Sequence, residues 1–523
     1  MGKMEEKRMG AKSIMIQGTM SNAGKSILVG GLCRVLAQDG YKVAPFKSQN
    51  MALNSYITEE GLEMGRAQVM QAEAARTSPS VKMNPLLLKP TNDMGSQVIV
   101  NGEVVGVMTA AEYFRKKTEY IPLIMEAYQE LEEQYDIIVI EGAGSPAEIN
   151  LKDNDIVNMG LAKLVDAPVL LVGDIDRGGV FAQVVGTIEL LCEEERKRIK
   201  GSIINKFRGD KEILKPGLRM LEERTNIAVR GVIPYFYLDI DDEDSLTERF
   251  YQKGKCSALD IVVIQFPRIS NFTDFTALSC MEDVSLRYVS APSDLGNPDA
   301  ILLPGSKNTI GDLLWMRQKG LEAQVIKHSH KGGLVFGICG GYQMLGEEIS
   351  DPFGSEQKGT IKGMGLLPVK TLFHKEKMRT RVKGMFLEVP GILKELRGIM
   401  AEGYEIHMGT TVLSDEKMAM LILEDCNQQE GKKTDGAYNE AGNVYGSYVH
   451  GIFDSSMIAK IVVSALLKQK GLDASEVSAV DMAAYKESQY NQLADIIREN
   501  LDMTGIYEII EKGNKASCIQ SFE

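Results

Sequence analysis

The 523-residue sequence predicts an α/β protein with two parallel-sheet domains, the second followed by a helical tail. Apolar runs of strand length recur along the chain and alternate with helical segments, which is typical of buried parallel strands. A glycine-rich loop with Lys25 and Ser26 follows the first run, and a tight turn around Cys339 follows a later one. These three observations place one candidate site in each domain.

Composition narrows the class of protein. With 44% hydrophobic and 25% charged residues, the chain has an ordinary soluble composition, and its length suggests about three domains. The net charge of −13 argues against nucleic acid or an anionic membrane as a partner. Seven cysteines without paired spacing favour a reducing cytoplasm. No signal peptide or membrane-spanning run is found in the sequence, so a cytoplasmic enzyme is expected.

The first apolar strand, residues 13–18, runs into a loop that ends in Gly24, Lys25 and Ser26, as phosphate-binding loops do. The loop is one residue longer than usual, because Thr19 stands where a glycine is common. Backbone N–H groups are expected to surround the phosphates of ATP, with Lys25 neutralising them and Ser26 holding Mg²⁺. The predicted ATP-binding residues of this loop are Gly18, Thr19, Ser21, Asn22, Ala23, Gly24, Lys25 and Ser26.

Polar residues follow the next short strand. Lys47, Gln49 and Asn50 lie there, and Lys89 ends the apolar run 84–91. The two lysines are able to meet carboxylates or phosphates, so all four are predicted as possible substrate-binding residues. A merely solvated loop is the simpler interpretation of the first three.

Acidic residues end two later strands. The run 135–141 ends in Glu141, where a nucleotide-binding α/β fold places a second magnesium ligand. Asp174 follows a second buried run, and Asn205 lies in a third. Strands that alternate with helices in this way indicate a doubly wound parallel sheet.

The predicted boundaries follow from composition. A polar, acidic stretch suggests a linker, and the chain after Asp454 reads as helical. The predicted parts are an ATP-dependent domain at 1–237, a linker at 238–258, a second domain at 259–455 and a helical extension at 456–523. In the extension, an apolar stripe is interpreted as a packing face; it consists of Tyr490, Leu493, Ile497 and Leu501.

The segment 334–346 has the spacing of a nucleophile elbow, with Gly337, Cys339 and Gly341 at alternate positions. A helix after the turn would favour a thiolate at Cys339, and the N–H of Gly340 would face an oxyanion. A buried core cysteine is the plainer alternative, and the flanking glycines argue against it.

A thiolate needs a general base, and His450 ends an apolar strand in a turn, which suits that role. Glu405 and His407 alternate on one face of another predicted strand. A satisfied structural pair is the preferred interpretation of these two residues.

The stretches FGICGGYQMLG and YGSYVHGIF together resemble a class I glutamine amidotransferase domain. The resemblance implies that Cys339 attacks L-glutamine, that His450 is its base, and that Gly305 or Ser306 offers a second oxyanion N–H. Members usually carry glutamate two residues after the histidine, where this chain has Ile452. The chain therefore resembles a branch with a Cys-His dyad, and a backbone carbonyl, Asp454 or Glu405 remain as candidates to orient the imidazole.

The longer phosphate loop resembles dethiobiotin synthetase, whose relatives activate carboxylates with ATP, and Asn205 matches the adenine-binding asparagine of that group. From residue 13 to 507 the motifs occur in the order of the cobyric acid synthase family, from GTMSNAGKS through EGAGSPAEINL and GICGGYQMLG to YGSYVHGIF. This resemblance implies an ATP-, Mg²⁺- and glutamine-dependent ligase in cobalamin biosynthesis. Its corrinoid substrate would be adenosylcobyrinic acid a,c-diamide, amidated at the b, d, e and g carboxylates, and a homo-oligomer is possible.

Two alternatives remain open. The sister enzyme, cobyrinic acid a,c-diamide synthase, has the same two domains and amidates a different pair of carboxylates. A non-enzymatic ATP switch, like the partition ATPases, shares the type of phosphate loop. The presence of both Cys339 and His450 speaks against a switch, which has no use for ammonia.

Overall fold

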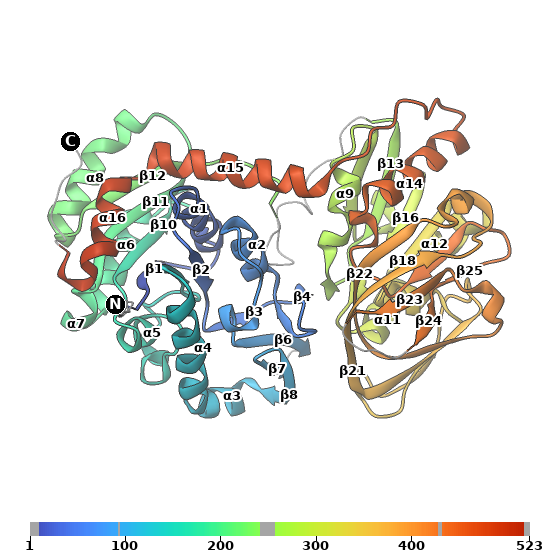
Figure 1. Cartoon of the computed structure of the whole chain (residues 1–523), viewed down its shortest axis with the longest axis horizontal. Coiled ribbons are helices and arrows are strands. Elements are labelled where there is room, and N and C mark those ends of the chain that lie inside the picture. Colours follow the sequence, from blue (N-terminus) through green and yellow to red (C-terminus); the bar gives the residue numbers. More distant parts are fainter. Residues whose placement is uncertain (1–9, 93–94, 241–256, 427–430, 517–523) are drawn as a thin grey trace, which may run out of the picture. The chain divides into compact units, whose positions relative to one another are not determined.

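The computed structural model describes residues 10–92, 95–240, 257–426 and 431–516 (Figure 1). Contacts divide the chain into two compact units. The first comprises Met1–Met51, Met64–Asp241 and Lys486–Glu523, and the second comprises Ala52–Glu63 and Asp242–Tyr485. Most of the predicted linker, residues 241–256, lies outside the described residues.

The first unit is built on a six-stranded sheet in the order β12-β11-β10-β1-β9-β2, with every neighbouring pair parallel. Its strands are β1 (Lys12–Gly18), β2 (Val43–Phe46), β9 (Ile137–Glu141), β10 (Val169–Asp174), β11 (Ile199–Phe207) and β12 (Val229–Pro234). The apolar runs form these strands because parallel strands are buried on both faces. The predicted parallel sheet is confirmed; β10, β11 and β12 follow β1 on one side, and β9 lies between β1 and β2 on the other.

Helices and a smaller sheet complete this part of the chain. The helices are α1 (Lys25–Gln38), α2 (Arg66–Ala74), α3 (Ala110–Lys116), α4 (Ile121–Gln134), α5 (Met159–Leu164), α6 (Val180–Leu190), α7 (Glu193–Arg196) and α8 (Lys211–Thr225). The smaller sheet has the order β3-β6-β7-β8. Its strands are β3 (Gln49–Met51), β6 (Leu86–Asn92), β7 (Gly95–Val100) and β8 (Glu103–Thr109).

The C-terminal helices α15 (Met482–Asn500) and α16 (Met503–Lys512), red in Figure 1, pack into the core of the first unit. The predicted apolar stripe is buried there; its members are Tyr490, Leu493, Ile497 and Leu501. Glycine at position 31 of α1 permits this approach, because a Cβ there would lie 2.6 Å from Cγ1 of Ile497. The predicted extension 456–523 is thus divided in the structure, since its first helix, α14 (Ser456–Gln469), belongs to the second unit.

The second unit contains a sheet in the order β15-β13-β16-β18-β26-β25. These strands are β13 (Leu259–Ile264), β15 (Val284–Val289), β16 (Ala300–Leu303), β18 (Leu334–Ile338), β25 (Ala437–Tyr438) and β26 (Val444–Ser447). All pairs are parallel except β25 with β26. The accompanying helices are α9 (Thr276–Ser279), α10 (Pro292–Leu295), α11 (Thr309–Lys319), α12 (Leu321–His330) and α13 (Gly340–Leu345).

A second, largely antiparallel sheet lies in the same unit. It consists of β19 (Glu348–Asp351), β20 (Gly359–Lys362), β21 (Val369–Phe386), β22 (Met400–Leu413), β23 (Leu421–Asp425) and β24 (Lys432–Asp435). Two short pairs are formed by β14 (Ile269–Ser270) with β17 (Gly305–Ser306), and by β4 (Ser55–Ile57) with β5 (Glu63–Gly65). Over the described ranges, no helix is long and apolar enough to cross a membrane.

Candidate active site

Cys339 occupies the predicted turn between β18 and α13, with φ 51° and ψ −107°. A positive φ is strained for a residue with a side chain, and such strain is common where a nucleophile is held in place. The glycines around it are sterically required, because a Cβ on Gly341 would lie 2.1 Å from the carbonyl oxygen of Leu303. The strand, turn and helix expected of an elbow are therefore observed.

His450 lies just beyond the end of β26 and is fully buried, with 1% of its surface exposed. Its Nδ1 is 2.7 Å from Oδ2 of Asp274, which is also buried. The other carboxylate oxygen of Asp274 accepts a hydrogen bond from the backbone N–H of Gly451 at 2.9 Å. Asp274 follows β14 in the turn before α9, so its backbone is fixed by structure on both sides.

The orientation of His450 corrects the expectation from sequence. Position 452 is indeed a buried isoleucine, but a side-chain carboxylate still holds the imidazole, so the dyad interpretation is wrong. The partner is none of the three candidates, since Glu405 instead forms an ion pair with Lys433. Asp274 lies in the sequence NFTDF, and no local pattern there marks it as a partner of a histidine 176 residues away.

The electrostatics favour a charged imidazole. Burial by itself lowers the pKa of His450, but the carboxylate of Asp274 and the hydrogen-bonded Cys339 outweigh it and raise the pKa to about 10. Below that pH the imidazolium form persists beside the sulfur. A cationic neighbour stabilises a thiolate, so the arrangement suits a thiolate–imidazolium pair.

Gly340, Gly305 and Ser306 lie together at this turn. A Cβ on Gly340 would be 2.8 Å from the backbone nitrogen of Ser306, and a Cβ on Gly305 would be 3.2 Å from Cε1 of His450. The residues predicted to offer oxyanion N–H groups thus lie beside Cys339 and His450. The Ser306 hydroxyl donates to Asp312 at 2.6 Å, which fixes the β17 end of this loop.

Strand β22 runs beside the sulfur, because Sγ of Cys339 lies 3.6 Å from the carbonyl oxygen of Ile406. Its neighbour His407 stacks on Tyr448 with ring centroids 3.7 Å apart, and Nδ1 of His407 pairs with the Gly409 carbonyl at 3.0 Å. Burial, then the charge of Lys433, lower the pKa of His407 to about 3. His407 is thus neutral and held by its own partners, as Glu405 is by Lys433.

The phosphate loop follows β1 and leads into α1. Gly24 has φ 91° and Asn22 φ 59°, left-handed values of the kind that occur in anion-binding nests. Nζ of Lys25 donates to the carbonyl oxygens of Met20 at 3.2 Å and Gly144 at 3.1 Å. The Thr19 hydroxyl contacts Gln183 at 3.2 Å. The Lys25 ammonium is therefore held over the loop, where a phosphate would be neutralised.

Glu141 is the centre of a buried polar cluster next to this loop, with 1% of its surface exposed. Its carboxylate accepts from the Ser26 hydroxyl at 2.8 Å, from Nζ of Lys47 at 2.9 Å and from Nε2 of Gln71 at 2.5 Å. Sequence reasoning identified Ser26, Lys47 and Glu141 but missed Gln71. The segment MGRAQVMQ, which leads into α2, carries no signal that distinguishes Gln71 from a surface glutamine.

The donor set fits Mg²⁺ bound together with a nucleotide. Across the described part of the chain, no three His, Cys, Asp or Glu side chains gather into an all-protein metal site. Mg²⁺ is commonly held by one or two protein oxygens together with substrate phosphates. The Ser26 hydroxyl and the Glu141 carboxylate, 2.8 Å apart, provide that combination.

The remaining predicted residues are divided between two places. Nδ2 of Asn205 donates to the Ala23 carbonyl at 2.8 Å, so this side chain braces the phosphate loop. Gln49 accepts a hydrogen bond from Tyr113 at 2.7 Å, and Asn50 donates to Gln68 at 3.0 Å. Gln49 and Asn50 lie on β3 and Lys89 on its neighbour β6, whereas Lys47 lies at the Glu141 cluster.

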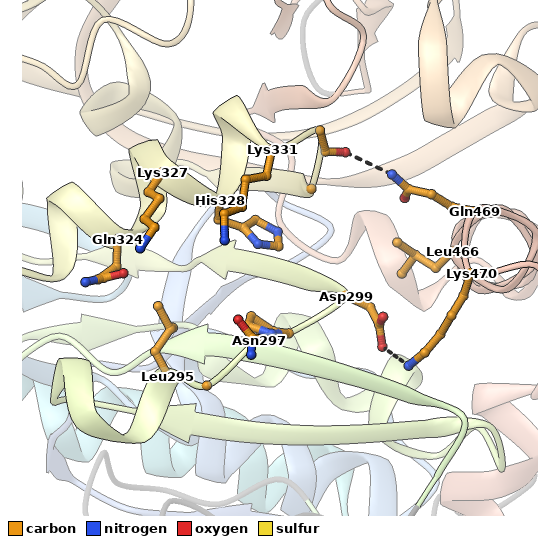
Figure 2. Close-up of a pocket in the computed structure, with 14 residues that line it drawn as sticks. Leu295, Asn297, Asp299, Gln324, Lys327, His328, Lys331, Leu466, Gln469 and Lys470 are labelled. Carbon is orange, nitrogen blue, oxygen red and sulfur yellow. Dashed lines mark hydrogen bonds and ion pairs between the residues drawn. The ribbon is translucent and has the colours of Figure 1, made fainter.

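Another hollow lies at the opposite edge of the second unit's parallel sheet (Figure 2). It is bordered by Asp299 just before β16, by His328 on α12, and by Lys470 after α14. Lys470 is paired with Asp299 at 2.8 Å, and His328 with the Leu334 carbonyl at 3.2 Å. Cys339 follows the carboxyl end of β18, so this hollow is separate from the candidate site.

Comparison with known proteins identifies two domains in this chain. Residues 14–242 match the model of the CobQ/CobB/MinD/ParA nucleotide binding domain, and residues 260–458 match that of the CobB/CobQ-like glutamine amidotransferase domain. The chain is 59% identical over 504 residues to the cobyric acid synthase of Ruminiclostridium cellulolyticum, covering 96% of this chain and 98% of the relative. The chain belongs to the cobyric acid synthase family.

Two further cobyric acid synthases support this assignment. The protein of Lachnoclostridium phytofermentans is 59% identical over 512 residues, which cover 96% of this chain and all of the relative. That of Clostridium acetobutylicum is 53% identical over 498 residues, covering 95% and 98%. Membership of the cobyric acid synthase family confirms the predicted family, the two-domain α/β fold and the class of enzyme, a glutamine-dependent ligase with a nucleotide-binding domain.

Proposed function

We propose that this protein amidates the b, d, e and g carboxylates of adenosylcobyrinic acid a,c-diamide, with ATP and L-glutamine as co-substrates. The observation that carries the proposal is the Cys339–His450–Asp274 arrangement in a chain that also carries the Ser26–Glu141 phosphate-loop cluster. The names of relatives at 53–59% identity over nearly the whole chain support the corrinoid substrate.

The second unit is proposed to release ammonia. Cys339 attacks the amide carbon of glutamine, and the N–H groups of Gly340 and of Gly305 or Ser306 receive the negative charge on the oxygen. His450 protonates the leaving ammonia and then activates the water that clears the thioester. The hydrogen bond between Nδ1 and Asp274 holds the imidazole so that Nε2 faces the sulfur.

The first unit is proposed to activate the carboxylate as an acyl phosphate. Lys25 and the backbone of the loop are proposed to hold the ATP phosphates, and Asn205 is proposed to contact the adenine because it matches the adenine-binding asparagine of the dethiobiotin synthetase group. Ser26 and Glu141 would hold Mg²⁺, which supplies charge neutralisation at the phosphates. Lys47 and Lys89 are proposed to meet substrate carboxylates. Ammonia displaces phosphate from the acyl phosphate and must travel sheltered from water, which would convert it to ammonium.

Product analysis tests the substrate directly. The purified protein, given the a,c-diamide with ATP, Mg²⁺ and glutamine, is expected to add four amides in succession, each visible as a mass change. Activity on unamidated cobyrinic acid alone, ending after two additions, would identify the sister enzyme instead. ATP hydrolysis that never responds to glutamine or a corrinoid would favour the ATP switch.

Replacement of Lys25 by alanine is expected to reduce amidation on the order of 10³-fold, because a cation at the transferring phosphoryl group carries much of the catalysis. The loss should be equal with glutamine and with ammonium, since carboxylate activation precedes both. Measuring both rates for Lys25→Ala, beside Lys42→Ala on the exposed surface, checks this. Substantial ammonium-driven synthesis in Lys25→Ala would mean that activation takes place elsewhere.

Introducing the glutamate that class I glutamine amidotransferases usually carry at this position, as Ile452→Glu, is expected to increase the glutaminase rate less than about 2-fold, because Asp274 already orients His450. Ile452 is 1% exposed, so the buried charge should cost about 3 kcal/mol of unfolding free energy. Denaturant titration and glutamate release measure the two effects, and Ile452→Gln separates charge from packing. A large gain in rate would show that Asp274 does not perform this role.

A further inference from the structure

The segment Ala52–Glu63 belongs by its contacts to the second unit, although the chain on both sides of it belongs to the first. It follows β3 and precedes α2, the helix that carries Gln71, a partner of Glu141. Asn54 and Ser55 are each 1% exposed. A stretch of the ATP-dependent part of the sequence is therefore buried within the amidotransferase unit.

Asn54 and Ser55 contact the residues that position the catalytic histidine. Oδ1 of Asn54 accepts the backbone N–H of Asn271 at 2.8 Å. Asn271 has φ 52° and begins the turn that carries Asp274, whose N–H donates to the Asn271 carbonyl at 3.1 Å. The acceptor on Asn54 thus fixes the first residue of the turn that presents Asp274 to His450.

Tyr404 provides a second connection between the Ala52–Glu63 segment and His450. Its ring stacks on the imidazole of His450 with centroids 5.3 Å apart and planes at 21°. The backbones of these two residues exchange hydrogen bonds of 2.9 and 3.2 Å. The Tyr404 hydroxyl accepts from Nδ2 of Asn271 at 2.7 Å and donates to the Ser55 carbonyl at 3.3 Å. Movement of the segment would therefore disturb both the ring and the carboxylate that hold His450.

Residues on both sides of the segment bond Glu141. Lys47 lies a few residues before it and Gln71 a few residues after it, and both bond the Glu141 carboxylate. Mg²⁺ bound with a nucleotide would compete with Lys47 and Gln71 for the Glu141 carboxylate. Both side chains would then have to form other hydrogen bonds. The ends of the segment would then shift when the nucleotide site fills.

Two buried polar atoms fit a second arrangement of this segment. Nδ2 of Asn54 and Oε1 of Gln71 have no hydrogen-bond partner among the described residues, although both residues are almost fully buried. Buried amide groups are normally satisfied, and an exception marks a place where another state offers a partner. One such atom lies on the segment and the other on the helix that follows it.

We infer that the Ala52–Glu63 segment is a coupling element: through Asn54 and Tyr404 it holds His450 in its reactive orientation, and it reports occupancy of the nucleotide site to the glutaminase site. The inference rests on the proposed function of the two sites. Asn54 and Tyr404 are positioning residues, since neither is placed to touch the reacting atoms of glutamine.

Asn54→Ala tests the inference in the full-length protein, with Glu60→Ala, at an exposed position of the same segment, as the matched control. In the wild type, glutamate release is expected to rise at least about 5-fold when a non-hydrolysable ATP analogue, Mg²⁺ and the corrinoid are added. In Asn54→Ala, kcat for glutamate release should fall at least about 10-fold with KM for glutamine nearly unchanged, because His450 is misplaced. The stimulation should disappear.

A readout independent of turnover is the rate at which iodoacetamide alkylates Cys339. The ATP analogue with Mg²⁺ should change this rate in the wild type and in Glu60→Ala, but not in Asn54→Ala. Tyr404→Phe keeps the ring stacked on His450 and removes only the hydroxyl contacts with Asn271 and Ser55. It should lose the nucleotide response as Asn54→Ala does, which guards against misfolding as the cause.

Equal nucleotide responses in Asn54→Ala, Tyr404→Phe and Glu60→Ala would overturn the inference, as would a wild type whose alkylation rate ignores the nucleotide. Ammonium-driven amidation tests the proposed function separately from the coupling. If the wild type shows no ammonium-driven amidation, the synthetase role is disproved. The alkylation rates of Cys339 would still decide whether Ala52–Glu63 couples the two sites.

Discussion

Cys339→Ala should abolish the use of glutamine, with a loss in kcat that reaches about 10⁶-fold when a nucleophile is removed. The reason is geometric, because the strained turn presents this one sulfur beside His450 and the N–H groups of Gly340 and Ser306. Alanine has no atom that can form the thioester. Glutamate release and glutamine-dependent amidation are therefore expected to disappear together.

The same variant should retain ATP-dependent amidation when ammonium is supplied at high pH, where free ammonia is abundant. The phosphate loop, with Lys25 and Glu141, belongs to the first unit and supplies no group to the thiol chemistry. Cys426→Ala, which removes an exposed free cysteine of the same unit, is the control. If a folded, ATP-binding Cys339→Ala protein cannot be rescued by ammonium, the proposed division of the reaction between two sites is wrong.

Asp274→Asn is expected to lower kcat for glutamate release by about 10⁴-fold, with little change in KM for glutamine. Asparagine has the same shape but carries no charge, so it stabilises the imidazolium less, and the thiolate–imidazolium pair of Cys339 and His450 becomes less populated. Ammonium-driven amidation should be unaffected. Asp294→Asn, at an exposed position of the same unit, provides the control.

The pH behaviour of Asp274→Asn gives a second measurement. In the native protein the pKa of His450 is raised to about 10, so the imidazolium is kept up to that pH and lost above it. Removing the carboxylate charge lowers this pKa, so the imidazolium should be lost at a lower pH than in the wild type. NMR titration of His450 measures the midpoint, and an unchanged midpoint would contradict the role assigned to Asp274.

Local chemistry was predictable where the functional atoms come from one short stretch of chain. In the phosphate loop, Gly24, Lys25 and Ser26 are contiguous, and the strand before them and the helix after them fix where their atoms point. The elbow at Cys339 is the same kind of case, because the close approach of Gly341 to Leu303 requires glycine at that position. Backbone geometry set by neighbouring residues can be read from spacing alone.

Partners that meet across the fold were not predictable in this way. Gln71 reaches Glu141 from a helix 70 residues earlier, and no local pattern around it marks this contact. The helical tail was correctly interpreted as a packing surface, yet its spacing could not tell which core it joins. A periodic apolar stripe reports that a face is buried and carries no information about the surface that buries it.

The sequence by itself determined the two-domain α/β class, which depends on how apolar runs recur along the chain, and the nucleotide loop, Cys339 and His450, which each depend on one short stretch. Only the tertiary structure decided that Asp274 orients His450, that Gln71 joins Glu141, and that Ala52–Glu63 belongs to the second unit. The physical reason is that a hydrogen bond acts over about 3 Å, whatever the separation in sequence. Which distant side chains come within that range depends on how the sheets and helices pack.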